Sequence, residues 1–441
     1  MPYPVYEIFV ISVTSLVIEF DRRRQLIIIL TESVTEQCIV TDNETLVNEI
    51  LSKRAFEKDT KGVLFIAAED ELDIDEVQRR VQKIYSNNQD LGMALFIPYK
   101  DPPRLRQRED GFVRSFWVSP ACLRKNIAQG MFTDFIKLAY ELLFANLNAA
   151  KSRIVDILQV GKKSAPEEDT IDEDLQSLKR SLLIIPHKGS LAFLKRCLRH
   201  LNQDLFLPDA INICFDDKGY QKFNTDSFEQ INAGVTVYAN NPGNVGPYCA
   251  RHYSIINTSK DYIFFQDSDD IPVNTRFAKQ IKEMKRRNLD MVGSHELRVD
   301  QFERQIVIVR YPLDVSAALK HGSFHPLFHP TAVISKAAYI RTGGFSTDLR
   351  FGYDSQFLIR SHFFLNSGNI DDFLYIRFKR PNSLTTDPKT KLGSNLRTFL
   401  LWRWQTEFRL VKENKLALVD SSLSVQKHSF DYNMIAVNKT I

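Results

Sequence analysis

The chain has 441 residues, of which 44% are hydrophobic, 11% aromatic and 25% charged. These proportions are typical of globular proteins and exclude a largely disordered, collagen-like or fibrous chain. Fifty-eight lysines and arginines against 54 aspartates and glutamates leave a net charge of +4, which is too small to require a nucleic-acid partner. The length predicts two or three domains, each able to bury its own core.

The cysteines and the apolar stretches indicate where the protein resides. Five cysteines are scattered without a CxxC pair, so we expect reduced thiols rather than disulfides or a zinc site. The most apolar early stretch, Val5 to Phe20, contains Glu7 and Glu19 and lacks the flanks of a signal peptide. No segment has the composition of a membrane span. The sequence therefore predicts a cytoplasmic protein.

An acidic segment with few apolar residues divides the chain. Residues 161–180 have the composition of a solvated linker, with carboxylates at Glu167, Glu168, Asp169, Asp172, Glu173 and Asp174. We predict one domain at residues 1–160, the linker at 161–180, a second domain at 181–393, and a C-terminal helix and tail at 394–441.

After the linker, short apolar strands alternate with amphipathic helices. We predict strands at Ser181–Pro186, Ile211–Phe215, Val235–Ala239 and Asp261–Gln266, and helices at Leu191–Leu201 and Tyr248–Thr258. This alternation predicts an α/β domain whose mostly parallel sheet is covered by helices on both faces. Ligands of such sheets bind beyond the carboxyl ends of the strands.

Polar residues gather where these strands end. His187 ends the first strand, Asp216 and Asp217 follow the second, and Asp267-Ser268-Asp269-Asp270 follows the fourth. One aspartate at a strand end is commonly a cap or turn residue. Two carboxylate clusters at one sheet edge repel each other unless a cation or a hydrogen-bonding ligand offsets them. The two clusters together therefore favour a binding site.

Five ordered pieces of the chain resemble glycosyltransferase family 2, whose domain has the Rossmann-like GT-A fold. They are SLLIIPHKGSLAFLKRCLRHL, ICFDDKG, NPGNVGPYCARHYSIINTSKDYIFFQDSDDIP, GGFSTDLRFGYDSQFLIR and RPNSLTT, between about Ser181 and Arg409. The resemblance implies a metal-dependent, inverting glycosyltransferase. It would move a sugar from a UDP-sugar, or less readily a dTDP-sugar, to a hydroxyl of a glycan or a lipid-linked saccharide.

The resemblance also implies roles for individual residues. Asp269 would bind Mn²⁺ or Mg²⁺, and Asp267 would face the ribose or share the cation through water. Asp217 would accept a hydrogen bond from the imide N–H of uracil, a donor that cytosine lacks. Further donor-binding residues would be Pro186, His187, Arg251, Ser268, Gly344 and Arg380. For Arg251, the alternative is a solvent-facing helix position.

Two positions depart from the family pattern. Similar proteins usually have Glu-Asp after the GGF piece, where this chain has Tyr353-Asp354; Asp354 would still act as general base, with a helix cap or a salt-bridge partner for Arg360 as the alternative. Relatives often have His before the proline of RPNSLTT, where this chain has Arg380, which cannot bind a cation but can pair with a diphosphate. His325 or His329 could supply the missing ligand, although packed and hydrogen-bonded histidines are expected.

The first half of the chain resembles the second at two fixed offsets. Aligning GVLFIAAEDELD with DYIFFQDSDDIP pairs Asp70 with Asp269, and aligning GMFTDFIKLAYELLF with GGFSTDLRFGYDSQF pairs Tyr140 with Tyr353. We therefore predict a degenerate GT-A-like copy within residues 1–160, acting as a scaffold, an acceptor-positioning module or a dimerisation module. The alternative is an unrelated α/β domain.

Residues 394–415, SNLRTFLLWRWQTEFRLVKENK, combine aromatic and basic side chains. They predict a helix that packs over the catalytic domain. The alternative is peripheral contact with the inner face of a membrane, near a lipid-linked acceptor. The last twenty or so residues show little periodicity.

Two other functions stay open. The replacement of the family glutamate by Tyr353 and the degenerate copy within residues 1–160 suggest a catalytically inactive carbohydrate-binding or scaffolding pseudoenzyme. A sugar-nucleotide pyrophosphorylase shares the α/β pattern, but PHKGSLAF has a single glycine where that class has a glycine-rich loop. The sequence leaves a homo-oligomer open as well.

Overall fold

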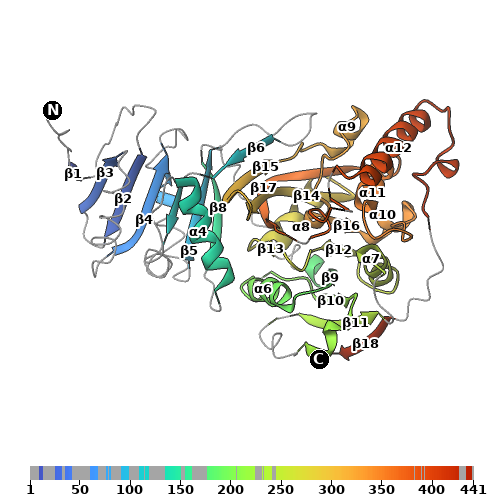
Figure 1. The fold of residues 1–441 in the computed structure, drawn as a ribbon, viewed down its shortest axis with the longest axis horizontal. Coiled ribbons are helices and arrows are strands. Elements are labelled where there is room, and N and C mark those ends of the chain that lie inside the picture. Colours follow the sequence, from blue (N-terminus) through green and yellow to red (C-terminus); the bar gives the residue numbers. More distant parts are fainter. Residues whose placement is uncertain are drawn as a thin grey trace. The chain divides into compact units, whose positions relative to one another are not determined.

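The structure is a computed structural model that forms two compact units (Figure 1). Met1–Asp101, Gly111–Glu167 and Glu303–Ile308 form the first unit, and Pro102–Asp110, Glu168–Phe302 and Val309–Ile441 form the second. The residues that the structure describes are 9–12, 25–31, 35–41, 60–67, 76–77, 79–80, 91–98, 109–113, 115–118, 135–149, 154–160, 176–204, 206–223, 231, 233–240, 245–381, 383–388, 390–391, 393–426 and 434–439.

The first unit contains a seven-stranded sheet in the order β1-β3-β2-β4-β7-β5-β8. Its strands are β1 (Phe9–Ser12), β2 (Gln25–Thr31), β3 (Thr35–Thr41), β4 (Thr60–Ala67), β5 (Leu91–Pro98), β7 (Ser115–Val118) and β8 (Ile154–Val160). Neighbouring strands are antiparallel except β5 and β8, which are parallel. Helix α4 (Phe135–Asn148) belongs to the same unit. Two further strands, β6 (Glu109–Phe112) and β15 (Gln305–Arg310), contribute residues to both units.

The second unit contains a mixed sheet whose main path is β13-β17-β14-β16-β12-β9-β10-β11-β18. Its strands are β9 (Ser181–His187), β10 (Ala210–Phe215), β11 (Gly234–Asn240), β12 (Tyr262–Phe265), β13 (Ile271–Pro272), β14 (Met291–Asp300), β16 (Val333–Ser335), β17 (Ser367–Lys379) and β18 (Met434–Lys439). The central strands β12, β9, β10 and β11 are parallel. The predicted α/β class with a parallel central sheet is therefore confirmed.

Helices cover both faces of this central sheet. They are α6 (Leu191–Leu201), α7 (Pro247–Ile256), α8 (Arg276–Arg286), α9 (Val315–Lys320), α10 (Lys336–Arg341), α11 (Tyr353–Ser361) and α12 (Asn395–Lys412), with 3₁₀ turns at Lys218–Lys222, His329–Thr331 and Leu418–Asp420. Alternate residues of β9 enter different cores, because successive side chains of a strand point to opposite faces. Leu183 packs in the core that α6 and α8 share, and Leu182 packs in the core of α7, α10, α11 and α12.

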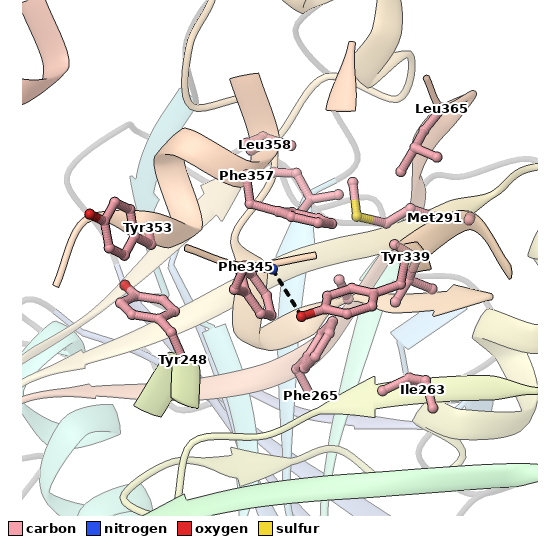
Figure 2. Packing of buried hydrophobic residues seen from close by; sticks show 14 of the residues in the cluster. Tyr248, Ile263, Phe265, Met291, Tyr339, Phe345, Tyr353, Phe357, Leu358 and Leu365 are labelled. Atoms are coloured by element: carbon pink, nitrogen blue, oxygen red, sulfur yellow. Dashed lines mark hydrogen bonds between the residues drawn. The ribbon is translucent and has the colours of Figure 1, made fainter. Parts of the chain in front are cut away.

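The second of these cores is rich in aromatic side chains (Figure 2). Phe345 is fully buried and lies against Phe265, Tyr339 and Phe357 at ring-centroid distances of 4.7 to 5.9 Å. The Phe345 amide donates to the Tyr339 hydroxyl over 2.9 Å. This core therefore fixes the backbone just after the GGF turn, on which the candidate site depends.

The C-terminal strand β18 was not expected from the sequence. It pairs antiparallel with β11 at the edge of the sheet, with Ala436 opposite Tyr238. Six residues are too few to show a reliable period. Their assignment to a strand depends on the partner strand, which lies about two hundred positions earlier in the chain.

The two units pair their strands differently. Strand β4, which contains Phe65, is antiparallel to both of its neighbours. Strand β12, its counterpart in the proposed repeat, is parallel to β9 and antiparallel to β16. Tyr140 lies inside α4, whereas Tyr353 begins α11. The topology therefore gives no support to the duplication, which stays a prediction; Asp70 lies outside the described residues.

Candidate functional site

The carboxyl ends of β9 and β10 present two aspartates with different surroundings. Asp217 accepts hydrogen bonds from the amides of Gly189 and Gly219, each over 2.7 Å, and so joins the loops that follow the two strands. Buried Asp216 accepts from the amides of Val245 (2.7 Å) and Gly246 (3.0 Å), just before α7 begins. Asp216 thus positions α7, a role that the sequence did not reveal, whereas Asp217 stays partly exposed.

Three carboxylates follow β12 and face one another. One oxygen from each of Asp267, Asp269 and Asp270 lies within 4.8 Å of the other two. Asp270 is buried and accepts from the Tyr375 hydroxyl (3.0 Å) and the Phe378 amide (2.8 Å). Burial, and then the charges of Asp269 and Asp267, raise the pKa of Asp270 well above its usual range. Hard oxygen donors at this spacing fit Mg²⁺ or Mn²⁺.

Two arginines neutralise the partly exposed members of this triad. The Arg251 Nη2 lies 2.6 Å from an Asp267 oxygen. The Arg380 Nη2 and Nε lie 2.7 and 3.0 Å from the same oxygen of Asp269. Arg251 is only 4% exposed, so the alternative of a solvent-facing helix residue is wrong. Burial keeps this guanidinium directed at the carboxylates.

Asp354 lies in the first turn of α11 and accepts a hydrogen bond from the Tyr248 hydroxyl over 3.0 Å. Tyr248 and Arg251 are three residues apart on α7 and therefore share one helix face. That face contacts both Asp354 and Asp267. Arg360, the salt-bridge partner considered for Asp354, is buried and donates instead to backbone carbonyls of Thr342 and Leu423, among others.

Tyr353, which replaces the glutamate of the family pattern, points into the core. Its ring packs against that of Tyr248, 5.7 Å between centroids (Figure 2). It also packs against Trp404 (6.2 Å), and its hydroxyl donates to Asp348. The side chain is buried. Tyr353 therefore supports the start of α11 and leaves the carboxylate of Asp354 as the acidic group of this turn.

His187, Ser268 and Pro186 complete the edge of the sheet. The buried His187 ring bonds through Nδ1 with the Ser268 hydroxyl over 2.9 Å, and its Nε2 has no partner among the described residues. Pro186 precedes it at a partly buried position of β9. Burial lowers the pKa of His187, while the charges of Asp217 and Asp269 oppose this shift. His187 is therefore a neutral group between the two carboxylate clusters.

The charged residues converge on one region. The carboxylates of Asp217 and Asp269 and the guanidinium of Arg380 all act on the His187 imidazole. Burial raises the pKa of Asp267 above its usual range. The charge of Arg251 opposes this shift, whereas the charge of Asp269 and, less strongly, that of Asp354 add to it. Helix α7 also links Asp354 to the triad, because its Tyr248 contacts Asp354 and its Arg251 contacts Asp267.

The GGF turn requires glycine. Gly343 and Gly344 have φ values of 81° and 78°, which side chains rarely adopt. A Cβ on Gly344 would lie 2.9 Å from both His252 and the Tyr339 ring. Gly344 therefore lets the turn approach the aromatic core closely.

The two histidines of SFHPLFHPTAV differ in environment. His325 is exposed. His329 is buried against Phe265 and Phe345, at 4.2 and 5.1 Å between centroids, and neither ring nitrogen has a partner in the described part of the chain. His329 is thus packed as expected, but the expected hydrogen bond is wrong. Burial, and then the charge of Arg251, lower its pKa well below 6.5.

Comparison with known proteins adds a family match. Residues 182–339 match the family model described as Glycosyl transferase family 2. Among solved structures, TarS 1–349 of S. aureus aligns at 14% identity over 52% of this chain and 65% of TarS 1–349, with a TM-score of 0.39. This chain therefore spans slightly less than two thirds of that structure. No curated protein sequence matches the chain.

Two structures with bound donors also align. TarS 1–349 in complex with UDP-GlcNAc has 14% identity over 54% of this chain and 74% of that one, with a TM-score of 0.39. The mannosyltransferase PcManGT from Pyrobaculum calidifontis, in complex with GDP-Man and Mn²⁺, has 13% identity over 54% and 72%, again with a TM-score of 0.39.

Replacing His329 should change how stability depends on pH. Because the folded protein resists protonating this ring, the unfolded chain binds more protons below about pH 6.5, and stability falls as the pH falls through that value. Phenylalanine fits the aromatic surroundings and cannot titrate. We expect His329→Phe to melt with a shallower dependence on pH between 7 and 5 than the wild type, measured by circular dichroism. His321→Gln, at an exposed position, serves as control; equal slopes for His329→Phe and wild type would refute the assignment.

Proposed function

Because residues 182–339 match the family model described as Glycosyl transferase family 2, we propose that the chain transfers a sugar from a UDP-sugar to an acceptor hydroxyl with inversion. The observation that carries the proposal is that Asp217 and Asp269 follow strands of one parallel sheet, while one face of α7 contacts both Asp354 and Asp267. Ligands of open α/β sheets bind at this edge. The acceptor that we propose is a glycan or a lipid-linked saccharide.

The uridine end of the donor would bind near Asp217 and Pro186. Both Asp217 oxygens already accept a backbone N–H, which fixes the carboxylate, and each keeps a second lone-pair direction for a uracil imide. Thymine has the same imide, so a dTDP-sugar is the secondary donor. His187 and Ser268, joined by their hydrogen bond, would line the same part of the site.

The diphosphate would bind between the aspartate triad and the arginines. Asp269 and Asp267 would bind Mn²⁺ or Mg²⁺, with buried Asp270 supporting the pair through Tyr375. A bound cation neutralises charge on the departing diphosphate. The guanidiniums of Arg251 and Arg380 already lie at these carboxylates and would add positive charge for phosphate oxygens. Gly344 would let the adjoining turn approach the donor.

Asp354 is the proposed general base. Its carboxylate would take the proton of the acceptor hydroxyl while that oxygen bonds to the anomeric carbon and the bond from this carbon to the diphosphate oxygen breaks. Attack from the face opposite the leaving group inverts the configuration. The Tyr248 hydroxyl, 3.0 Å from Asp354, would orient the carboxylate.

Substitutions should separate donor binding from proton transfer. Asp354→Asn should retain donor affinity but lower turnover by about two to four orders of magnitude, as expected for loss of a general base. Asp269→Ala should abolish Mn²⁺-dependent UDP binding. UDP release from a panel of UDP-sugars, with and without Mn²⁺, measures turnover, and calorimetry measures binding.

Asp420→Asn, at an exposed position, is the matched control and should behave as wild type. Wild-type protein that releases no UDP with any donor would favour the inactive carbohydrate-binding alternative. An Asp354→Asn variant that keeps most of its rate would exclude Asp354 as the base.

Helix α12 supports a proposal about contact with a membrane, where a lipid-linked acceptor would lie. Trp404 and Phe408 are buried, and Trp404 contacts Tyr353 beside Asp354. On another face, Phe399 and Trp402 are 52% and 60% exposed, with ring centroids 6.3 Å apart. The helix has four basic residues and one acidic residue, namely Arg397, Arg403, Arg409, Lys412 and Glu407. No helix in the described ranges is long and apolar enough to cross a bilayer.

We therefore propose that the face of α12 that carries Phe399 and Trp402 contacts an anionic membrane surface. Aromatic and basic side chains together favour binding to such a surface. Trp402→Ala should reduce co-sedimentation with phosphatidylcholine vesicles containing phosphatidylglycerol, and added salt should weaken wild-type binding. Phe302→Ala removes an aromatic ring that is 51% exposed elsewhere in the second unit and should leave binding unchanged. Equal sedimentation of wild type with and without vesicles would exclude the contact.

A further inference from the structure

Every carboxylate of the aspartate triad already has a protein partner. Asp270 accepts from Tyr375 and Phe378, Asp267 pairs with Arg251, and Asp269 pairs with Arg380. The oxygens still lie within 4.8 Å of one another, a spacing that fits a divalent cation. Guanidiniums therefore occupy positions at the carboxylates that a cation would also require.

Arg251 and Arg380 differ in burial and in their position in the fold. Arg251 projects from α7, is 4% exposed, and lies near the rings of Tyr248 and Phe265. Arg380 follows the end of β17, and its side chain is 16% exposed. The Arg380 guanidinium lies over the Phe193 ring, 4.4 Å from the centroid. Arg251 is therefore held by a helix and by burial, whereas Arg380 lies beyond the end of a strand with a more exposed side chain.

Arg380 binds the Asp269 oxygen in a way that competes with a metal. Both Nε and Nη2 donate to the same oxygen, Oδ2, over 3.0 and 2.7 Å. A cation bound to this oxygen would lie beside the guanidinium, and like charges at such a distance repel. Binding of one at this oxygen therefore disfavours binding of the other there.

We propose that Arg380 is an exchangeable counter-ion of Asp269. In the absence of donor it neutralises Asp269; when a divalent cation binds, the guanidinium leaves the carboxylate and pairs with the donor diphosphate. Its planar fork matches phosphate oxygens, and its charge already acts on His187 at the same sheet edge. The inference rests on the proposed function, because it takes Asp269 as a metal ligand, and it makes Arg380 a positioning residue that couples cation binding to donor binding.

The exchange predicts effects of opposite sign for one substitution. Without nucleotide, Arg380→Ala should bind Mn²⁺ more tightly than wild type, on the order of tenfold, because the competing cation is gone. With Mn²⁺ at saturation, the same variant should bind UDP more weakly, also on the order of tenfold, because the guanidinium that would pair with the diphosphate is lost. Electron paramagnetic resonance of free Mn²⁺ measures the first affinity, and calorimetry measures the second.

Matched variants make the experiment decisive. Arg341→Ala removes an arginine from another aspartate pair, with Asp290, and should change neither affinity. Asp269→Ala should abolish Mn²⁺ binding with either residue at position 380. Arg380→Lys, which keeps a cation, should shift both affinities in the same directions as Arg380→Ala but less. Two results would overturn the exchange. One is an Arg380→Ala variant that binds both Mn²⁺ and UDP more weakly than wild type while its melting temperature is unchanged. The other is an Arg380→Ala variant whose Mn²⁺ affinity equals that of wild type.

These titrations need no turnover. Absence of UDP release by the wild type would refute the proposed transferase reaction, while the Mn²⁺ and UDP affinities of Arg380→Ala decide the exchange separately.

Discussion

Charge balance at one sheet edge is the constraint on which the site depends. Parallel strands bring their carboxyl ends together, so the aspartates after β10 and β12 lie near one another. Carboxylates at such distances repel and resist burial. The fold offsets this cost with backbone amides for Asp216 and Asp217, with arginines for Asp267 and Asp269, and with Tyr375 for Asp270.

Helix α7 connects the parts of this arrangement. Its start is fixed by Asp216, and its first turns direct Tyr248 to Asp354 and Arg251 to Asp267. One helix therefore contacts the aspartate of β10, the triad after β12 and the start of α11. A small shift of α7 would change all three contacts together, so the proposed base and the proposed metal ligands share one support.

The sequence predicted the elements that have strong local patterns. The strands from Ser181 to Gln266 and the helix Leu191–Leu201 agree with the structure to within about two residues, because buried strands are short apolar runs bounded by polar residues and amphipathic helices have a clear period. Placement of Asp217, Asp267 and Asp269 at one edge followed from parallel topology, and residues 182–339 match the family that the motifs resembled.

Other features depend on contacts between distant residues, which no local pattern contains. The bond from Tyr248 to Asp354 joins positions 106 apart, and the pair of Arg380 and Asp269 joins positions 111 apart. Among the residues that the structure describes, the ring nitrogens of His329 have no partner, which likewise reflects its aromatic surroundings. Strand β18 is defined by its partner β11. The replacement of glutamate by Tyr353 was visible in the sequence, but its packing against Tyr248 and Trp404 was not.

Thermal unfolding of the wild-type protein with UDP, with Mn²⁺, and with both ligands tests the account most directly. A ligand that binds the native state raises the melting temperature, so a nucleotide diphosphate held by carboxylates through a cation should stabilise the protein most when both are present. We predict a larger increase with the combination than the two single increases together. A melting temperature unchanged by millimolar UDP and Mn²⁺ would contradict a nucleotide-sugar site at this edge of the sheet.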